Sequence, residues 1–184
     1  MSDINNRCLD VFPQWLDTVG SDVAILRDVL LNSEAEENVK RKVAGGINYL
    51  FKSLDLIPDG IDDIGYLDDA FVLRMSAVSA VSAGIDSLPD NLKERLHQLA
   101  ADTSLIKELL EDTLFAKFEK YCNSLSDGSA RGRTVDEIIT DENVRKELLD
   151  DITAFVNEYK SLGFNKDEKN LIKLKAFMEA KLPA

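Results

Sequence analysis

The sequence predicts an all-α fold, arranged as a multi-helix bundle. Apolar residues recur at intervals of three and four along most of the chain, which is the spacing of amphipathic helices. No stretch alternates apolar and polar residues over a strand's length, and no Asn-Gly or Asp-Gly pair stands between β-branched runs. A chain of 184 residues that is 45% hydrophobic can bury a proper core.

Two helices are predicted at the start of the chain. The first covers about 5–18, and Pro13 lies inside it as a kink or a restart, because proline has no backbone N–H to donate. Gly20 then ends this helix. Ser21 is a good N-cap residue and opens a second helix, which runs to about residue 31.

A third helix follows, with Ser33 and Glu36 as its capping box, and it ends near residue 56. Gly45 and Gly46 lie in its interior, where glycine costs about 1 kcal/mol relative to alanine. We therefore expect another segment to approach closely there. The apolar stripe of this helix is Val39, Val43, Ile47, Leu50 and Leu54.

An aspartate-rich bend comes next. Six aspartates and no basic residue lie between Asp55 and Asp69, and Pro58, Gly60 and Gly65 interrupt the helical pattern. The helix that follows, about 66–86, is apolar or small on most of its circumference, which predicts a central position in the bundle. Arg74 is the exception on this helix.

Two further helices complete a predicted helical core over residues 1–122. Ser87 and Asp90 are expected to cap the first of them, and the second runs over about 103–121. Residues 123–133 are rich in serine and glycine and predict a flexible loop.

Residues 134–184 predict a short helix and then a C-terminal helical hairpin that packs on the core. Thr134 and Glu137 form a capping box for the short helix. The first long helix of the hairpin stops at Gly163. Asn165 and Glu168 then cap the last helix, whose outer lysines, Lys166, Lys169 and Lys173, we interpret as a solvated face.

The net charge excludes some classes of binding partner, and the cysteine content indicates the cellular compartment. A net charge of −12 argues against nucleic acid and against anionic membranes, because both need a positive protein surface. Cys8 and Cys122 are far apart, so we expect free, buried thiols in a reducing, cytoplasmic setting. We expect no signal peptide from residues 1–12, and the charges in the most apolar window, 66–85, predict a buried helix and not a membrane span.

The bend also carries a family resemblance. Residues 55–59, Asp-Leu-Ile-Pro-Asp, are followed by Gly65 and then by Leu-Asp-Asp at 67–69. In order and spacing they resemble the YkvA-like domain of unknown function, over about residues 44–83. Leu54 stands where that family often has proline, and the extra acids at 62 and 63 also depart from its usual pattern. The resemblance implies a helical hairpin with an acidic turn, and it brings no established activity, substrate or cofactor.

Two interpretations of the aspartates stay open, and we favour the first. As caps and hydrogen-bond acceptors near the start of a helix, they would meet backbone amides and the positive end of the helix dipole, which would hold their pKa values below the unfolded value of about 3.9. In the second interpretation, a divalent cation such as Mg²⁺ or Ca²⁺ is held by Asp55, Asp59, Asp68 and Asp69.

The sequence indicates only a broad class of function for this protein. His97 is the one histidine and is expected at the surface, and no nucleophile elbow, phosphate loop or dinucleotide motif is present. We expect no cofactor and a non-enzymatic interaction or regulatory module with a protein partner. The alternatives are a metal-dependent hydrolase of phosphate esters that uses the aspartates, and a peripheral membrane factor. Self-association stays open.

Overall fold

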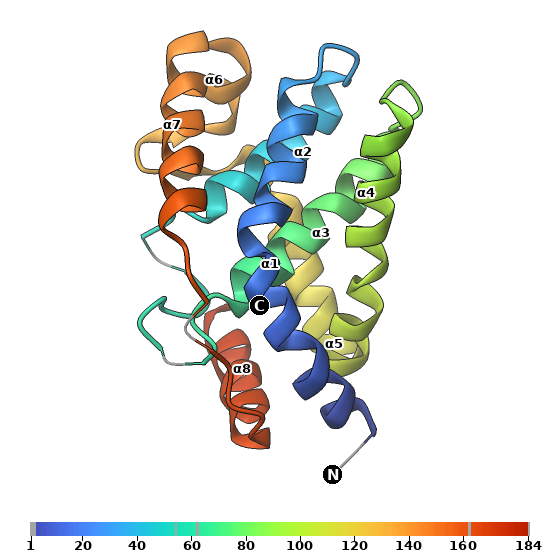
Figure 1. Ribbon diagram of the computed structural model, residues 1–184, viewed down its shortest axis with the longest axis vertical. Coiled ribbons are helices and arrows are strands. Elements are labelled where there is room, and N and C mark those ends of the chain that lie inside the picture. Colours follow the sequence, from blue (N-terminus) through green and yellow to red (C-terminus); the bar gives the residue numbers. More distant parts are fainter. Residues whose placement is uncertain (1–2, 54, 62, 162, 184) are drawn as a thin grey trace.

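The computed structural model describes residues 3–53, 55–61, 63–161 and 163–183. Almost every element is helical (Figure 1), which confirms the all-α prediction. The helices are α1 (Asp3–Leu31), α2 (Glu37–Tyr49), α3 (Leu67–Ala83), α4 (Asp90–Ala101), α5 (Thr103–Ser124), α6 (Val135–Thr140), α7 (Glu142–Glu158) and α8 (Glu168–Lys181), with a 3-10 turn, η1 (Leu125–Asp127).

The helix after the aspartate bend occupies the centre of the bundle, as predicted. α3 packs against α1, α2, α4 and α5, and Figure 1 shows it behind α1 and between its neighbours. Eleven consecutive residues, 67–77, are buried, including three with charged side chains. An apolar helix of this kind must be covered on every side, so the other helices assemble around it.

The start of the chain differs from the prediction, because one helix replaces the expected two. α1 runs without a break from Asp3 to Leu31, through both Pro13 and Gly20. Val19 and Val23, on either side of the glycine, are both fully buried. Burial of that face stabilises the continuous helix by more than the roughly 1 kcal/mol that an interior glycine costs.

Only one of the predicted capping boxes forms. The Thr134 hydroxyl accepts from the backbone N–H of Glu137, whose carboxylate accepts in return from the backbone N–H of Thr134. At α8 the cap is Asp167, which accepts from the Lys169 N–H at 2.9 Å. The predicted caps that fail are Ser33 with Glu36, Ser87 with Asp90, and Asn165 with Glu168. A capping pattern in sequence is short, and packing decides where a helix begins.

Residues 123–134 hold η1 and a two-stranded antiparallel hairpin that the sequence did not predict, β1 (Ser129–Ala130) and β2 (Arg133–Thr134). Leu125 and Ala130 are buried, and this segment packs against α2. The hairpin turn at Arg131 and Gly132 has positive φ at both residues, which is the backbone geometry of a tight hairpin turn.

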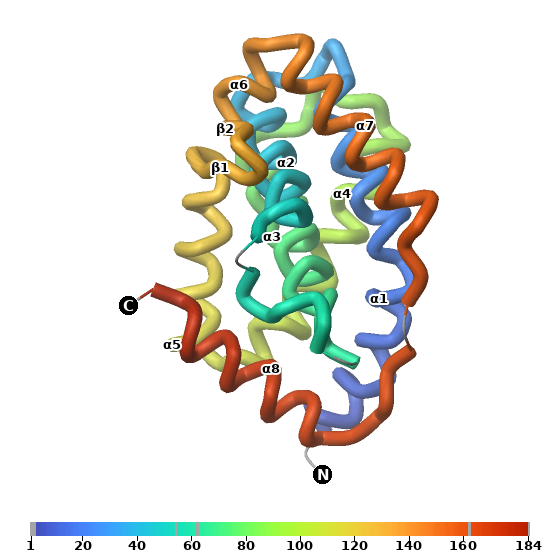
Figure 2. The backbone as a smooth tube through the Cα atoms, turned by 90° about the vertical axis from the view of Figure 1, so that its left-hand side faces the viewer, coloured from blue at the N-terminus to red at the C-terminus, as the bar shows by residue number. Residues whose placement is uncertain are grey.

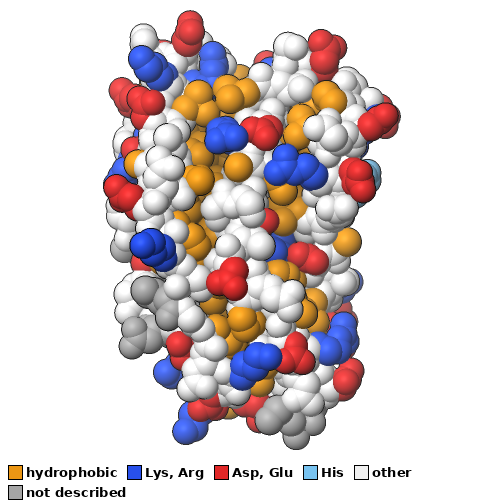
Figure 3. All heavy atoms as spheres, viewed as in Figure 1, with side chains coloured by type: hydrophobic (Ala, Val, Ile, Leu, Met, Phe, Trp, Pro, Cys, Tyr) orange, Lys and Arg blue, Asp and Glu red, His pale blue; other side chains and the backbone are white. Residues whose placement is uncertain are grey.

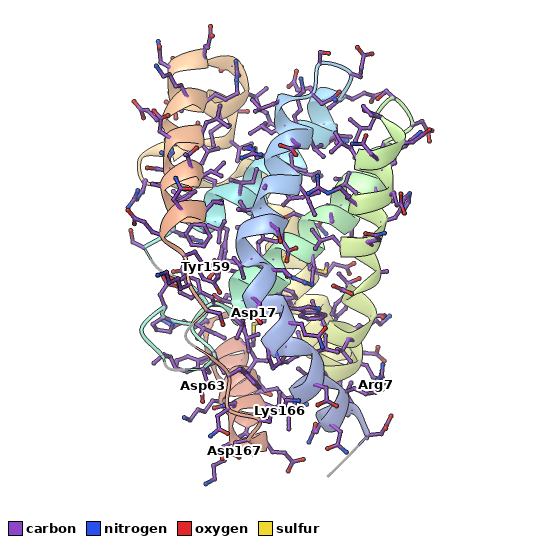
Figure 4. The ribbon with its side chains drawn as sticks, viewed as in Figure 1. Arg7, Asp17, Asp63, Tyr159, Lys166 and Asp167 are labelled. Carbon is purple, nitrogen blue, oxygen red and sulfur yellow. The ribbon has the colours of Figure 1, made fainter. Side chains whose placement is uncertain are left out.

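The predicted C-terminal helical hairpin is wrong in its arrangement. α7 packs against α6 and α1, whereas α8 lies beyond its end, across α5 and α1 (Figure 2). The long helix also stops at Glu158, before the expected Gly163, and Leu162 lies outside the described residues. After it, the Tyr159 hydroxyl donates to the Leu16 carbonyl at 2.7 Å (Figure 4), which directs the chain along α1.

The glycine pair of α2 marks two close approaches, as expected. A Cβ at Gly46 would overlap the Ser76 side chain of α3. A Cβ at Gly45 would lie 2.7 Å from the backbone carbon and oxygen of Leu125. Only hydrogen side chains therefore let α2 lie against both α3 and η1.

Substitution of Gly45 and Gly20 by alanine should have opposite effects on stability. Gly45→Ala should lower the free energy of unfolding by about 1–3 kcal/mol, because the backbone at Leu125 must move. Gly20 is helical, and a Cβ added there would have none of the described atoms within 4 Å, so Gly20→Ala should raise it by about 0.5–1 kcal/mol. Urea denaturation measures both, and equal effects of the two substitutions would contradict the close packing at Gly45.

Deletion of residues 134–184 should leave an aggregating protein. Leu148 and Ile152 of α7 and Leu174 of α8 are fully buried, so their partners on the remaining helices would become exposed apolar surface. Size-exclusion chromatography and circular dichroism of the fragment measure this outcome. A monomeric fragment of unchanged helicity over its remaining residues would instead identify the tail as an independent unit.

Candidate functional site

The bend between α2 and α3 begins earlier than the sequence predicts. α2 ends at Tyr49 and not near residue 56. The reason is tertiary, because the Leu56 backbone N–H donates to the Tyr49 hydroxyl at 2.9 Å and the chain folds back over the end of α2. Leu54, the last member of the predicted stripe, lies outside the described residues.

The rest of the bend is a compact series of turns. The Ile61 N–H donates to the Pro58 carbonyl at 2.9 Å, and the Leu67 N–H donates to the Ile64 carbonyl at 3.1 Å. A side chain at Gly65 would collide with the Asp59 carbonyl, so glycine is required at that position. Ile57 and Ile64 are fully buried, which anchors the bend in the core.

Asp68 is the centre of the site. Its side chain is fully buried, and its Oδ2 accepts from the Tyr49 hydroxyl at 2.5 Å and from the Ile57 backbone N–H at 3.0 Å. One carboxylate oxygen thus joins the end of α2, the bend and the start of α3. The other oxygen, Oδ1, is buried without a hydrogen-bond partner among the described residues.

Two more carboxylates carry buried oxygens without donors in the described part of the chain. These are Oδ2 of Asp69, a residue only 2% exposed, and Oδ1 of the half-buried Asp55. Asp59 is exposed at the outer edge of the bend. Asp63, labelled in Figure 4, accepts from the Asn170 side chain of α8 at 3.1 Å, and the predicted acid Asp62 lies outside the described residues. We call Asp55, Asp59, Asp68 and Asp69 the acid cluster.

The electrostatics of the acid cluster are opposite to the expectation from capping. Burial raises the pKa of Asp68 to about 7, against the smaller lowering effects of its bonds to Tyr49 and Ile57. Burial also raises the pKa of Asp55 to about 7, with Asp59 adding to the shift and Lys52 opposing it. The pKa of Asp69 lies well above its usual value, through burial and then through repulsion by Asp68. Desolvation outweighs the helix dipole here.

Capping also fails as a structural description of the start of α3. Tyr66 is the N-cap residue of this helix and makes no side-chain capping bond. The backbone N–H that Asp68 accepts belongs to Ile57 in the bend and not to its own helix. Hydrogen bonding to the backbone is therefore present at Asp68 and lowers its pKa as predicted, but burial outweighs this effect, so the net shift of the pKa was predicted with the wrong sign.

Few cations offset the acids. Arg74 lies on the same helix but pairs with Asp22 of α1 and Asp102 after α4, and so does not reach the acid cluster. Lys52 donates to the Tyr121 hydroxyl of α5 at 3.0 Å and is the base that lowers the pKa of Asp55. The acid cluster therefore has more carboxylates than nearby cations can balance, and these carboxylates are largely shielded from water.

A metal site does not follow directly from this geometry. Within the described ranges, no three Asp, Glu, His or Cys side chains are arranged to hold a metal ion. A cation bound by Asp55, Asp59, Asp68 and Asp69 would need the bend to rearrange, and this ligand set stays a prediction.

Other catalytic chemistry has little support. His97 is exposed on α4, as predicted. Cys8 and Cys122 are free and buried, also as predicted, and burial raises the pKa of Cys8 to about 12 and that of Cys122 well above its usual value. Neither thiol is activated as a nucleophile, because the reactive form is the thiolate.

Sequence reasoning missed two residues of this site, Tyr49 and Tyr121. The Tyr49 hydroxyl donates to Asp68 and accepts from Leu56, and the Tyr121 ring meets the Tyr49 ring edge-on at 6.2 Å. A tyrosine within the buried stretch of α2, directly before an acidic bend, was the available signal for Tyr49. Nothing local marks Tyr121, which comes from α5.

The comparisons with known proteins single out the same segment. Residues 39–74 match a family model described as "Protein of unknown function (DUF1232)". This range covers most of α2, the whole bend and the first half of α3, and it contains all of the acid cluster. The expected resemblance to a domain of unknown function is thus confirmed for this part of the chain. Neither the curated proteins nor the solved structures yielded a match.

Substitution of Asp55 by asparagine should stabilise the protein at pH 8. The folded pKa is raised, so the stability that the protonated acid contributes is present below the unfolded pKa and is lost as pH rises toward about 7. Asparagine cannot ionise and avoids that loss. With about 1.4 kcal/mol per pKa unit, discounted for partial exposure, we expect a gain of about 1–2 kcal/mol at pH 8 that shrinks toward zero at pH 4.

Urea denaturation at the two pH values measures this, with Asp112→Asn as the control because Asp112 is exposed on α5. A loss of stability at pH 8 in Asp55→Asn would restore the capping interpretation for that residue.

Proposed function

We propose that this protein is a non-enzymatic regulatory module whose state is set by neutralisation of the acid cluster. The observation that carries the proposal is the set of three buried carboxylate oxygens, on Asp55, Asp68 and Asp69, that have no hydrogen-bond donor among the described residues. A buried ionised carboxylate without a partner is expensive, so such a group must take up a proton or a cation.

Of the two, we favour protons as the species that neutralises the acid cluster. The pKa values of Asp55 and Asp68 are both raised to about 7, so the cluster changes charge close to neutral pH. Folded-state stability from these groups is greatest in acid and declines as pH rises from about 4 to about 7. The linked protons are shared within the cluster, because Asp68 and Asp69 repel each other when both are ionised.

The bend is the part of the structure that would respond. Asp68 holds the bend through the Ile57 N–H, while Pro58, Asp59 and Gly60 are exposed. When the neighbouring acids ionise, repulsion acts between the bend and the first turn of α3. Release of the bend would change the surface between α6 and α7 on one side and α8 on the other, where Figure 2 shows this segment. A protein partner that binds only one of the two states would then be regulated.

We place this module in the cytoplasm, where unpaired cysteines stay reduced. Among the described residues, no helix has both the length and the apolar composition needed to cross a membrane. With a net charge of −12 we expect neither nucleic acid nor an anionic membrane as partner. The chemistry of the surface favours a partner with a basic face.

A second candidate function rests on the same three buried carboxylate oxygens that have no hydrogen-bond donor among the described residues. Carboxylate oxygens are the ligands that Mg²⁺ and Ca²⁺ prefer, so a divalent cation could take the place of the protons once the bend opens. A metal-dependent hydrolase of phosphate esters would first need a divalent cation bound at this site.

Amide NMR shifts of residues 50–66, followed from pH 5 to pH 8, test the proposal. In the natural protein these shifts should titrate together with a midpoint near 7. In Asp59→Asn the midpoint should fall, because Asp59 is a charged neighbour that raises the pKa of both Asp55 and Asp68, and in the control Asp112→Asn it should not change. Midpoints below about 4.5 in the natural protein, near the ordinary values of carboxylates, would reject the proposal.

Addition of MgCl₂ or CaCl₂ at pH 8 separates the two candidates. If protons alone neutralise the acid cluster, MgCl₂ or CaCl₂ at pH 8 should restore the pH 5 spectrum no more than NaCl does at the same ionic strength. A saturable recovery in the natural protein that is absent in Asp69→Asn would favour the cation.

A further inference from the structure

A groove of about 480 Å³ lies between the end of α1, the first turn of α2 and the helices α6 and α7. This volume falls within the range of about 300–1,000 Å³ that is usual for small-molecule sites. The apolar walls come from Leu30, Leu31 and Ile139, and Leu31 is 50% exposed, so apolar surface is available there to a ligand. On the face drawn in Figure 3, hydrophobic side chains follow the line between α7 and α1, with basic side chains beside them.

The groove contains an arginine, Arg145, that has no carboxylate partner among the described residues. Every other arginine of the chain forms an ion pair with at least one aspartate or glutamate. Arg145 instead donates from Nη1 to the Ile138 and Ile139 carbonyls of α6, at 3.0 Å in each case. In a chain of net charge −12, a guanidinium left without an acid is unusual.

The two bonds to α6 hold the Arg145 guanidinium in place and leave one of its edges unused. Nε and Nη2 have no hydrogen-bond partner in the described part of the chain, and both are accessible to solvent, because neither is one of its buried unpartnered atoms. These two nitrogens form the edge on which a carboxylate accepts two parallel hydrogen bonds. An anion can therefore bind this edge without displacing any bond that the protein makes.

Lys40 gives the groove a second positive charge without a partner. Its side chain is half-buried in the first turn of α2, and its Nζ makes no ion pair or hydrogen bond within the described ranges. Among the described lining residues, Glu37 is the one acid, and it is exposed and pairs with neither base. The lining therefore carries one positive charge in excess. Because α1 ends and α2 begins here, their helix dipoles oppose each other and do not decide the sign.

We propose that this groove binds a small carboxylic acid, in which a carboxylate ends a short aliphatic chain. The carboxylate would accept from Nε and Nη2 of Arg145 and would lie close to Lys40. The aliphatic chain would lie against Leu30, Leu31 and Ile139. This site shares no residue with the acid cluster, so the proposal is independent of the function proposed above.

Charge and geometry favour a carboxylate over other classes of small ligand. An organic cation would be repelled by Lys40 and Arg145. A phosphate monoester carries a charge of about −1.5 to −2 at pH 7, which exceeds the single positive charge in excess. An uncharged alcohol would cover the free edge of Arg145 without pairing its donors, which costs free energy. A carboxylate balances the charge and uses both donors.

Titration with sodium hexanoate at pH 7 tests the proposal. Isothermal titration calorimetry measures the affinity, and the methyl NMR shifts of Leu30, Leu31 and Ile139 locate the site. We expect saturable binding, with the largest shifts at these methyl groups. Lys40→Gln and Arg145→Lys should each weaken hexanoate binding by about tenfold. Arg145→Lys keeps the charge, so its weaker binding reports the loss of the paired hydrogen bonds.

Lys146→Gln is the matched control, because Lys146 is exposed on α7 and is not among the described lining residues. It removes the same charge as Lys40→Gln and should bind hexanoate as the natural protein does. 1-Hexanol, which has the same chain and no charge, should bind at least about tenfold more weakly than hexanoate. Thermal melts establish that each variant is folded at the temperature of the titration. Lys40→Gln leaves the bonds of Arg145 to α6 in place, so it tests the site even if Arg145→Lys is unfolded.

Four results would overturn the proposal. They are the absence of saturable hexanoate binding to the natural protein, equal binding by Lys40→Gln and Lys146→Gln, equal binding of 1-hexanol and hexanoate, and tighter binding of inorganic phosphate than of hexanoate. The last result would identify the two bases as a phosphate site in which the apolar walls take no part.

Discussion

The hydrogen bonds to a single carboxylate oxygen hold together the bend between α2 and α3. Asp68 Oδ2 accepts from the Tyr49 hydroxyl at the end of α2 and from the Ile57 N–H in the bend, while Asp68 itself lies in the first turn of α3. The Tyr49 hydroxyl in turn accepts from Leu56. The end of α2, the bend and the start of α3 meet there. Loss of this oxygen as an acceptor would leave the Tyr49 hydroxyl and the Ile57 N–H without the partner that they share.

The central helix carries two charged systems that do not interact as partners. Asp68 and Asp69 lie at its start, and Arg74 lies further along with two carboxylates. At 100° per residue, Arg74 is rotated by about 140° from Asp69 and by about 240° from Asp68 around the helix. The arginine therefore faces α1 and α4, and the acids face α2 and the bend. Helical geometry separates opposite charges that are close in sequence.

This separation makes the acid cluster a place where charge is costly. Desolvation acts on Asp55, Asp68 and Asp69 together, and each ionised member makes ionisation of the next less favourable. Tyr49 cannot relieve this further, because it already donates its one hydroxyl proton to Asp68. A proton or a cation is what remains to neutralise the acid cluster, and the proposed regulatory role depends on that neutralisation.

Local sequence determined the helical class, the central position of the apolar helix, the close packing at Gly45 and Gly46, and the existence of an acidic bend at Pro58. Each of these depends on residue spacing or on the conformational limits of glycine and proline, which act over a few residues. Tertiary structure decided that α1 continues through Gly20, that α2 ends at Tyr49, and that α7 and α8 do not form a hairpin. It also decided the direction of the aspartate pKa shifts, because desolvation depends on every segment that covers a carboxylate, and Tyr49, Ile57 and α5 reach Asp68 only in the folded chain.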